Sequence, residues 1–546
     1  MNAAFLLIGV VIVICILLDR FLEKLPIPPL LFFIALGMCF GENGLLRIPF
    51  DDYEAVNLIC SASLVFIMFY GGFGTNLKAA RPVAAPAVVL STLGVAGTAG
   101  AVGLFAHFAL KLPWLESLLI GSVVSSTDAA TVFNILRSKK LALKNHTDSL
   151  LEVESGSNDP MSYMLTTVLI ALMSGQQVSI PLLLAQQLVL GAAAGLVVGR
   201  LAVWLLGKNL FTSQQSRTVF LFGVVLLAYA LPAMWGGNGY LSVYLCGIML
   251  GNARMAQKKY LVHFFDVVTG VAQVIIFFLL GLLVTPVELP QVLLPALAVM
   301  LFLTVAARPL VTGALLLPFR PSLGQVGVVS WAGLRGAASI VFAISAVLSG
   351  VETTYNLYNL VFCIVLLSML IQGTLLPRVA GGLSMIDEQG DISKTFTDYQ
   401  EERDISFIKI HLEPGHPWRG RALRELMPLK DLLIVMVVRG EDTIVPNGDT
   451  RLEEGDLLVL AAYPFEEREN LRLSELTVER GHRLAGRTLA DIASAPNSPK
   501  YLIVLIQRGQ ETVIPTGSTV ILPGDVLILA QSEGGKPRAQ AGAAEE

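Results

Sequence analysis

The residues most able to do chemistry lie in one apolar stretch, from Asp148 to Leu165. Beyond Asp148 at its start, it contains the carboxylates Glu152, Glu154 and Asp159, and the residues around them predict a single helix that crosses a membrane. An ionisable group near the bilayer centre costs about 2.5–3.5 kcal/mol on insertion scales, so by default it marks an ion or proton pathway. The stretch therefore predicts a transport site inside a membrane.

The spacing of these acids divides them between two faces of the predicted helix. Asp159 shares one face with Glu152 and Ser155, whereas Glu154 and Asn158 form the neighbouring stripe. Asp159 lies about 16 Å from the start of the helix, which is near mid-membrane. A carboxylate at that depth is desolvated, so a proton and a metal cation can compete for it. For Glu154 we favour a structural role, and for Glu152 a position at the membrane surface.

A second polar interruption, Ser122–Thr131, places hydroxyls and the carboxylate of Asp128 in an otherwise apolar span. Irregular backbone at membrane depth persists only where it lines a cavity or is buried in protein. A monovalent cation prefers oxygen ligands, which freed carbonyls, Thr127 and Ser155 could supply. The carboxylates of Asp128 and Asp159 would complete this predicted metal site. An aspartate that only caps the second half of the broken helix is the simpler alternative.

Two arginines, Arg308 and Arg335, also lie inside predicted spans. Arginine keeps its proton at any relevant pH, so both are fixed counter-charges. Arg335 lies between glycines in the second of two interrupted spans, at Ser330–Ser339, and Glu154 is its natural partner. A buried pair of this kind tends to specify geometry more than it stabilises. Arg308 is either a second buried counter-charge or a side chain that extends to the cytoplasmic membrane surface.

Composition places these segments in a multi-span membrane protein. The chain has 546 residues, of which 54% are hydrophobic, and its mean hydropathy is +0.68, too apolar for a soluble protein of this length. Charged residues are sparse before residue 387 and dense after it. The net charge of -4 gives no case for nucleic acid binding. The five cysteines all lie in apolar spans, without zinc-binding spacing.

The apolar segments predict about thirteen transmembrane helices. They cover residues 3–18, 28–40, 55–74, 82–109, 113–136, 148–173, 181–206, 216–235, 236–252, 263–285, 288–317, 324–349 and 355–377. Alternate loops differ in charge, because one set holds nearly all the lysines and arginines and the other only Arg47 and Lys111. This bias predicts an N-terminus outside the cell and a cytoplasmic C-terminal region.

The interrupted segments around Asp128 and Arg335 are the fifth and the twelfth spans, seven spans apart. An odd offset gives two repeats of opposite orientation, which is the usual plan of a secondary transporter. We therefore predict that spans 1–6 and 8–13 are inverted repeats and that the seventh span joins them. The prediction depends on position alone, because the two halves show no obvious sequence identity.

The C-terminal region contains a repeat that the sequence does show. Gly415-His416 recurs as Gly481-His482, and Gly455-Asp456 recurs as Gly524-Asp525. Each copy has a short helix-like piece followed by β-rich runs with Gly-Asp turns, which predicts two small α+β modules. The predicted divisions are a membrane domain (1–384), a linker (385–404), two modules (405–470 and 471–533) and a disordered tail (534–546).

Three motifs together resemble the electroneutral cation/proton antiporters, the NhaP-type bacterial proteins and their eukaryotic sodium/proton exchanger relatives. They are Ser126–Ala130, Glu154–Pro160 and Gly333–Ala337, in the family's order and in the corresponding spans. The resemblance covers about residues 1–380. It implies an all-α membrane domain of thirteen helices with inverted repeats and two crossed broken helices. It also implies a homodimer surrounded by lipid in the bacterial inner membrane.

The resemblance also implies roles for individual residues. In that family the aspartate that matches Asp159 carries the cation and the proton in turn. The residues that match Glu154 and Arg335 form a structural charge pair. The pairing of Asn158 with Asp159 accompanies one-for-one exchange. The implied ion and proton site consists of Asp159, Asp128, Thr127, Ser155 and Asn158.

One position departs from the family pattern, and the C-terminal repeat adds to it. Many relatives have Phe-Glu-Gly-Gly in the third span, where this chain has Phe69-Tyr70-Gly71-Gly72, so one carboxylate is missing and its replacement is open. The C-terminal modules resemble the RCK-C (TrkA-C) modules of potassium-transport proteins. Such modules bind small ligands, often nucleotides, and usually dimerise. The combination favours regulated K⁺/H⁺ exchange, with no cofactor in the membrane domain.

Other functions are weaker matches. A ligand-gated cation channel uses similar modules, but no glycine-rich filter with a pore helix is seen, and a channel needs no titratable group at mid-membrane. A Na⁺(Li⁺)/H⁺ antiporter without K⁺ transport stays open. An organic-anion transporter would need unpaired arginines facing a cavity, for which Arg308 is the only candidate. An enzyme is not expected, because the C-terminal region has neither a paired nucleophile and base nor a cluster of metal ligands.

Overall fold

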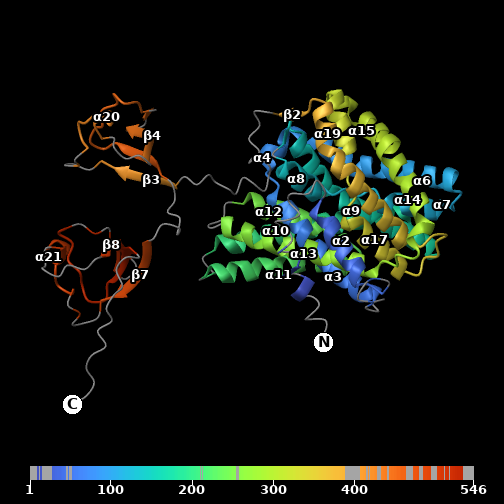
Figure 1. Ribbon diagram of the computed structural model, residues 1–546, viewed down its shortest axis with the longest axis horizontal. Coiled ribbons are helices and arrows are strands. Elements are labelled where there is room, and N and C mark those ends of the chain that lie inside the picture. The colour runs from blue at the N-terminus through green and yellow to red at the C-terminus, as the bar shows by residue number, and fades with distance from the viewer. Residues whose placement is uncertain are drawn as a thin grey trace, which may run out of the picture. The chain divides into compact units, whose positions relative to one another are not determined.

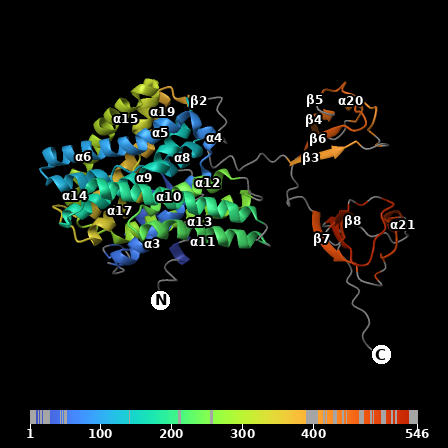
Figure 2. The same ribbon diagram turned by 180° about the vertical axis from the view of Figure 1, so that it is seen from behind.

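The computed structural model separates into a helical unit that ends at Glu401 and a β-rich unit that follows it (Figure 1, Figure 2). The first predicted span falls largely outside the described residues, and so do residues 388–404 of the linker and the tail 534–546. The described residues are 9–11, 13–14, 17, 28–42, 44, 47, 52–139, 141–208, 211, 213–253, 258–387, 406–412, 416, 418–426, 432–439, 442–444, 446–462, 471–478, 482, 484–493, 501–508, 511–513, 515 and 517–532.

The helical unit follows the predicted order of apolar segments from the second span onward. Within the described ranges, seven continuous helical stretches are long and apolar enough to cross a membrane. The elements are α2 (Pro29–Phe40), α3 (Tyr53–Gly74), α4 (Leu77–Ala80), η1 (Arg81–Val83), α5 (Ala84–Val89), η2 (Leu90–Gly94), α6 (Val95–Leu110), α7 (Trp114–Val123), α8 (Ala129–Ser138), β1 (Ala142–Leu143), α9 (Thr147–Met173), α10 (Ile180–Gly207), α11 (Gln214–Ala233), α12 (Gly239–Asn252), α13 (Lys258–Leu283), α14 (Leu289–Phe302), η3 (Leu303–Ala307), α15 (Arg308–Leu316), η4 (Leu317–Phe319), α16 (Leu323–Trp331), α17 (Ala337–Leu348), α18 (Leu357–Leu367), η5 (Ser368–Gly373), α19 (Thr374–Gly382) and β2 (Ile386–Asp387).

Short polar side chains begin several of these helices. The Asp52 carboxylate accepts a hydrogen bond from the N–H of Ala55 at the start of α3. Ser213, Asn238 and Ser322 cap α11, α12 and α16 in the same way. Each cap satisfies one backbone N–H that lacks a partner within the helix, which fixes where an apolar segment becomes helical.

Glycines allow the closest approaches between helices. A Cβ atom on Gly37 of α2 would lie 2.2 Å from the carbonyl oxygen of Phe278 in α13. One on Gly72 of α3 would lie 2.3 Å from the carbonyl oxygen of Tyr244 in α12. Small residues let helix backbones touch, which is how membrane helices associate without a hydrophobic driving force. Two tightly packed helix pairs, α2 with α13 and α3 with α12, result.

Buried apolar side chains of the helical unit form two clusters. The larger cluster includes residues of α2, α3, α11–α14, α17 and α18. The smaller cluster joins α5, α8, α9, α16 and α19, and it contains Leu334 from the segment between α16 and α17. The smaller cluster therefore supports the helices on either side of that break.

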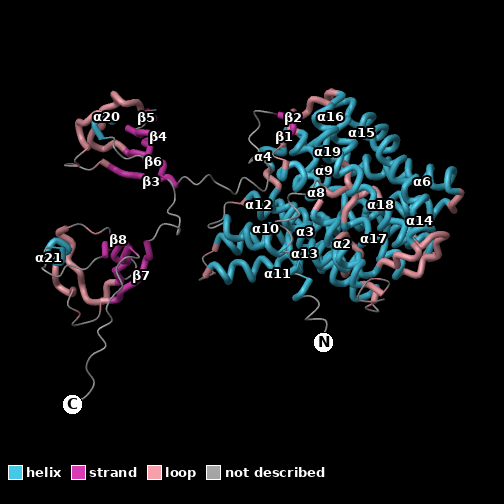
Figure 3. Tube along the Cα trace, in the orientation of Figure 1, coloured by secondary structure: helices cyan, strands magenta, loops and turns pink. Residues whose placement is uncertain are grey.

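The β-rich unit contains two modules of the same topology, as the sequence repeat predicts (Figure 3). Each has a four-stranded antiparallel sheet, in the order β3-β6-β4-β5 in the first module and β7-β10-β8-β9 in the second. The elements are β3 (Ser406–His411), α20 (Leu423–Leu426), β4 (Leu432–Arg439), β5 (Asp442–Ile444), β6 (Leu457–Ala462), β7 (Leu471–Thr477), α21 (Leu489–Ala493), β8 (Tyr501–Arg508), β9 (Glu511–Val513) and β10 (Val526–Ser532).

The same ion pair occurs in both modules. In the first, Arg439 donates from Nε to Oδ1 of Asp456 at 2.8 Å and from Nη2 to Oδ2 at 2.9 Å. Arg508 and Asp525 repeat this two-pronged pair in the second module. The hydrogen bonds from Arg439 hold the pKa of Asp456 below its usual value. The aspartates of the two Gly-Asp turns are thus structural residues of each module.

We expect Asp456→Asn to lower the free energy of unfolding of the first module by about 2 kcal/mol, a typical value for hydrogen bonds to a charged group. Because the pKa of Asp456 is lowered by folding, its contribution is present above the unfolded pKa and is lost as the pH falls through the folded value. Hydrogen–deuterium exchange of β4 and β6 in the full chain measures this loss.

The exposed pair of Asp449 with Arg424 provides a matched control. Exposed ion pairs contribute little, so Asp449→Asn is expected to leave exchange almost unchanged. Equal exchange rates in the two variants would show that Asp456 does not stabilise the module.

Candidate functional site

The two interrupted helices meet at their breaks, which confirms that both spans are broken. Residues 124–128 separate α7 from α8, and residues 332–336 separate α16 from α17. The backbone N–H of Asp128 donates to the carbonyl oxygen of Leu334 at 2.8 Å and so joins the breaks. A Cβ atom on Gly336 would lie 2.5 Å from Cβ of Asp128, so a glycine is needed for this approach.

The Asp128 carboxylate caps the second half of its helix. It accepts hydrogen bonds from the N–H of Thr131 at 3.2 Å and from the Thr131 hydroxyl at 2.6 Å. This is the arrangement expected for a helix N-cap. The same side chain lines the cavity described below, so it combines a structural role with access to an ion.

Asp159 points from α9 toward the break between α7 and α8. Its side chain is almost completely buried. Within the described part of the chain, its carboxylate accepts one hydrogen bond, from the hydroxyl of Ser126. Sequence reasoning placed Ser126 in a family motif but did not assign it to the site. The available signal was its position next to Thr127 in the same polar interruption.

Three other predicted site residues hold α9 against this break. The Ser155 hydroxyl donates to the carbonyl oxygen of Thr127 at 2.7 Å. The Asn158 amide donates to the Thr127 hydroxyl, and its oxygen accepts from the Thr127 N–H at 3.4 Å. Thr127, Ser155 and Asn158 therefore fix the position of Asp159 relative to Asp128.

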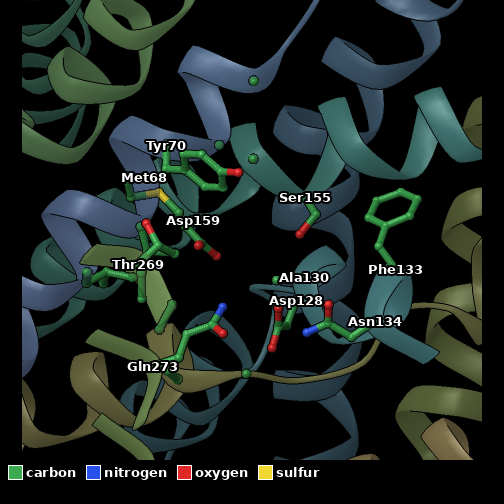
Figure 4. A pocket seen from close by; sticks show the side chains of 18 of the residues that line it. Met68, Tyr70, Asp128, Ala130, Phe133, Asn134, Ser155, Asp159, Thr269 and Gln273 are labelled. Atoms are coloured by element: carbon green, nitrogen blue, oxygen red, sulfur yellow. The ribbon is translucent and has the colours of Figure 1, made fainter. Parts of the chain in front are cut away.

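A cavity of about 620 Å³ reaches both carboxylates (Figure 4). Its walls come from α3, α8, α9, α13 and the segment before α17. Tyr70, at the position of the missing family carboxylate, lines it together with Thr269 and Gln273 of α13. Sequence reasoning missed the last two, although with Asp266 they form a polar stripe at positions i, i+3 and i+7 of α13. The acidic side chains that line the cavity are those of Asp128, Glu152, Asp159 and Asp266. Together with the neutral oxygens they suit binding of a monovalent cation.

The predicted charge pair of Glu154 with Arg335 is wrong. Arg308 donates from Nη1 to Oε1 of Glu154 at 2.8 Å, and the exposed fractions of the two side chains are 3% and 1%. Arg308 is therefore a buried counter-charge and does not extend to the membrane surface. Arg335 instead donates to the carbonyl oxygens of Ser125 and Ser126, each at 2.8 Å.

The physical reason is the break itself. The carbonyl groups of Ser125 and Ser126 lie just after the end of α7, where the helical hydrogen-bond ladder stops, and each carries partial negative charge. They lie next to Arg335 in the facing break and attract its guanidinium. Glu154, on the neighbouring face of α9, pairs with Arg308 of α15 instead. This buried pair is consistent with the structural role expected for Glu154, but with a different partner.

Broken helices that meet around carboxylates, with a cavity that reaches them, define a multi-span membrane protein of transporter architecture. The chain belongs to the sodium/hydrogen exchanger family, whose transmembrane model matches residues 9–381. The TrkA-C domain model matches residues 408–466 and 473–534. Both matches confirm the resemblance inferred from the motifs and from the C-terminal repeat.

Relatives with similar sequences carry antiporter names. The K(+)/H(+) antiporter NhaP of Alkalimonas amylolytica is 39% identical over 388 residues, which cover 70% of this chain and 67% of that protein. The K(+)/H(+) antiporter NhaP2 of Shewanella sp. (strain ANA-3) is 34% identical over 468 residues, covering 84% and 80%. The fold is similar to that of the sodium proton antiporter MjNhaP1 from Methanocaldococcus jannaschii at pH 8, with TM-score 0.62, 23% identity and coverage of 70% and 99%.

Proposed function

We propose that this chain exchanges a monovalent cation, K⁺ in preference to Na⁺, for H⁺ by alternating access. The observation that carries the proposal is the cavity that ends on Asp159, a buried carboxylate beside the meeting point of two broken helices. The relatives named as K⁺/H⁺ antiporters favour K⁺.

Asp159 is the carrier in this proposal. When it holds a proton the carboxyl is neutral, and when it holds a monovalent cation the pair is also neutral. The site therefore has the same net charge in both loaded states, which makes the exchange one-for-one and electroneutral. Asp128, Thr127, Ser155 and Asn158 would surround the cation, and the neutral oxygens of α13 stand opposite them on the cavity wall.

The Glu154–Arg308 pair and Arg335 provide fixed charges for this cycle. Arg308 neutralises Glu154 away from the cavity, since neither side chain lines it. Arg335 donates to the carbonyl oxygen of Ser126, whose hydroxyl donates to Asp159. These contacts can hold the site in shape while the occupant of Asp159 changes.

We infer thirteen transmembrane helices in two inverted repeats, and the positions of irregular features support this inference. The breaks fall in the fifth and twelfth spans, and π-helical segments η2 and η3 fall in the fourth and eleventh. The glycine contacts of α2 with α13 join the second and tenth spans. Those of α12 with α3 join the ninth and third spans. With an offset of seven spans, the second span corresponds to the ninth and the third to the tenth, so the two contacts are equivalent.

The proposed setting is the bacterial inner membrane, with the N-terminus periplasmic and the TrkA-C modules in the cytoplasm. Large apolar side chains are exposed along α10 and α11, which suits contact with lipid or with the second copy of a homodimer. We also propose that the modules bind a nucleotide, because they resemble RCK-C modules.

Reconstituted vesicles test the function. The full chain is placed in vesicles that contain a pH-sensitive dye and a pH gradient, and pulses of K⁺, Na⁺, Li⁺ and choline are added. We expect K⁺ to dissipate the gradient most effectively and choline to have no effect. A response to Na⁺ and Li⁺ without K⁺ would overturn the cation assignment, and the absence of any cation response would overturn antiport.

A further inference from the structure

The segment that leads to the TrkA-C modules is fastened to the helical unit by a two-stranded sheet (Figure 3). Strand β1 pairs antiparallel with β2, so that Ala142 faces Asp387 and Leu143 faces Ile386. Lys144 extends the contact, because its N–H donates to the carbonyl oxygen of Met385 at 2.9 Å. We call residues 142–144 together with residues 384–387 the clasp.

Left-handed backbone turns place both strands of the clasp. Asn145 and His146, between β1 and α9, have φ of 59° and 52°, and Ser384, after α19, has φ of 55°. Such conformations are uncommon outside glycine and persist where the surroundings hold them. Here Lys144 Nζ donates to the carbonyl oxygen of Ser384 at 3.1 Å, and Gln325 of α16 donates to that of Asn145 at 3.2 Å.

The clasp is continuous with the apolar cluster that supports the broken helices. Leu143 and Met385 are buried in this cluster, which also contains Val132 of α8 and Leu334 at the break before α17. A Cβ atom on Gly324 of α16 would lie 2.8 Å from the carbonyl oxygen of Leu383, so this approach is close. A displacement of β2 would therefore shift the side chains packed between it and the break before α17, because close-packed interiors transmit strain.

Strand β1 also lies in the connection between the two helices nearest to the site carboxylates. It connects α8, which Asp128 caps, to α9, which carries Asp159. Asp159 follows Thr147 by twelve residues of one uninterrupted helix, a rise of about 18 Å. A shift or tilt imposed at β1 is thus passed to the two helices that position the carboxylates.

We propose that the clasp transmits the state of the TrkA-C modules to the ion site. This inference rests on the proposed antiport and on its regulation by the modules. In sequence, β2 is the last described element before the first module. Two module states that pull differently on the chain after β2 would therefore bias β1 between two positions. Coupling between distant sites requires such a differential contact in the two states.

A disulfide across the clasp makes the proposal testable in the full chain. Ala142→Cys with Asp387→Cys places two thiols on residues paired across an antiparallel ladder, where Cα atoms lie about 4.5–5.5 Å apart, within disulfide range. Oxidation closes the clasp and a reductant releases it. The single variants, oxidised in parallel, control for bonds to the five native cysteines.

The clasp pair is then combined with Asp456→Asn, which perturbs the first module, and K⁺-driven proton flux is measured. With the clasp reduced, we expect Asp456→Asn to change the flux about fivefold, the lower end of typical allosteric coupling. With the clasp oxidised, we expect that effect to disappear. Asp525→Asn repeats the test through the second module, and the exposed Asp449→Asn should change the flux in neither state.

The outcomes distinguish a failure of the clasp proposal from a failure of the proposed antiport. An equal effect of Asp456→Asn in the oxidised and reduced proteins would overturn transmission through the clasp and leave antiport and regulation intact. No effect of Asp456→Asn or Asp525→Asn in the reduced protein would overturn regulation by the modules and the clasp together. No K⁺-driven flux in the unsubstituted chain would overturn the proposed function itself.

Discussion

Asp159→Asn is expected to reduce cation-driven proton flux to the level of vesicles without protein. Asparagine keeps the size of the side chain and an oxygen that can accept from the Ser126 hydroxyl. It can neither ionise nor release a proton, so the site loses both the charge that attracts the cation and the group that carries H⁺. Flux is measured as the change in internal pH after a K⁺ pulse.

Glu116→Gln is the matched control for this substitution. Glu116 is also a buried acid of the helical unit, but its carboxylate accepts from the N–H and hydroxyl of Thr354, both at 2.8 Å, and it does not line the cavity. We expect this variant to retain K⁺-driven flux. Retained flux in Asp159→Asn would mean that another group carries the proton.

Glu154→Gln is expected to destabilise the folded protein far more than it changes cation affinity. The substitution leaves the Arg308 guanidinium buried without a counter-charge. Breaking one side of a buried ion pair typically costs about 3–5 kcal/mol. Thermal unfolding, followed by the loss of monodisperse protein in detergent, should therefore begin at a lower temperature. The K⁺ concentration for half-maximal flux in the surviving protein should change little.

Double substitutions decide which arginine is the partner. Because Glu154 contacts Arg308, the combination of Glu154→Gln with Arg308→Gln should be less destabilised than the sum of the two single variants. The combination of Glu154→Gln with Arg335→Gln should come closer to additivity. Stronger coupling to Arg335 would contradict the observed pair, and so would a large loss of K⁺ affinity with normal stability in Glu154→Gln.

The broken helices and the shared face of Asp159 and Ser155 on α9 could be predicted from sequence because the membrane makes their signals strong. Charged side chains are costly in lipid, so Asp128 and Arg335, set among hydroxyls or glycines that interrupt an apolar span, indicated irregular backbone buried in protein. Helical periodicity then placed Asp159 and Ser155 on one face. The structure adds that Ser155 reaches the break through Thr127.

The partner of Glu154 could not be predicted by the same reasoning. Arg308 and Arg335 are chemically equivalent, and their distances from Glu154 depend on how helices far apart in the sequence pack. Only the structure shows that Arg335 donates from Nη1 to the carbonyl groups of Ser125 and Ser126 in the facing break.

The clasp escaped prediction for a different reason. Its strands are two residues long and lie on opposite sides of eight predicted spans, and such short pairings have no periodic signature in the sequence.

One-for-one exchange is tested most directly by the ion gradients at which net flux stops. Vesicles that contain the full chain are prepared with equal inside-to-outside ratios of K⁺ and of H⁺, and a permeant anion is used to vary the membrane potential. The proposal predicts no net proton movement at equal ratios for any membrane potential, with reversal of flux on either side. A stopping point at unequal ratios, or one that moves with the potential, would contradict electroneutral exchange at Asp159.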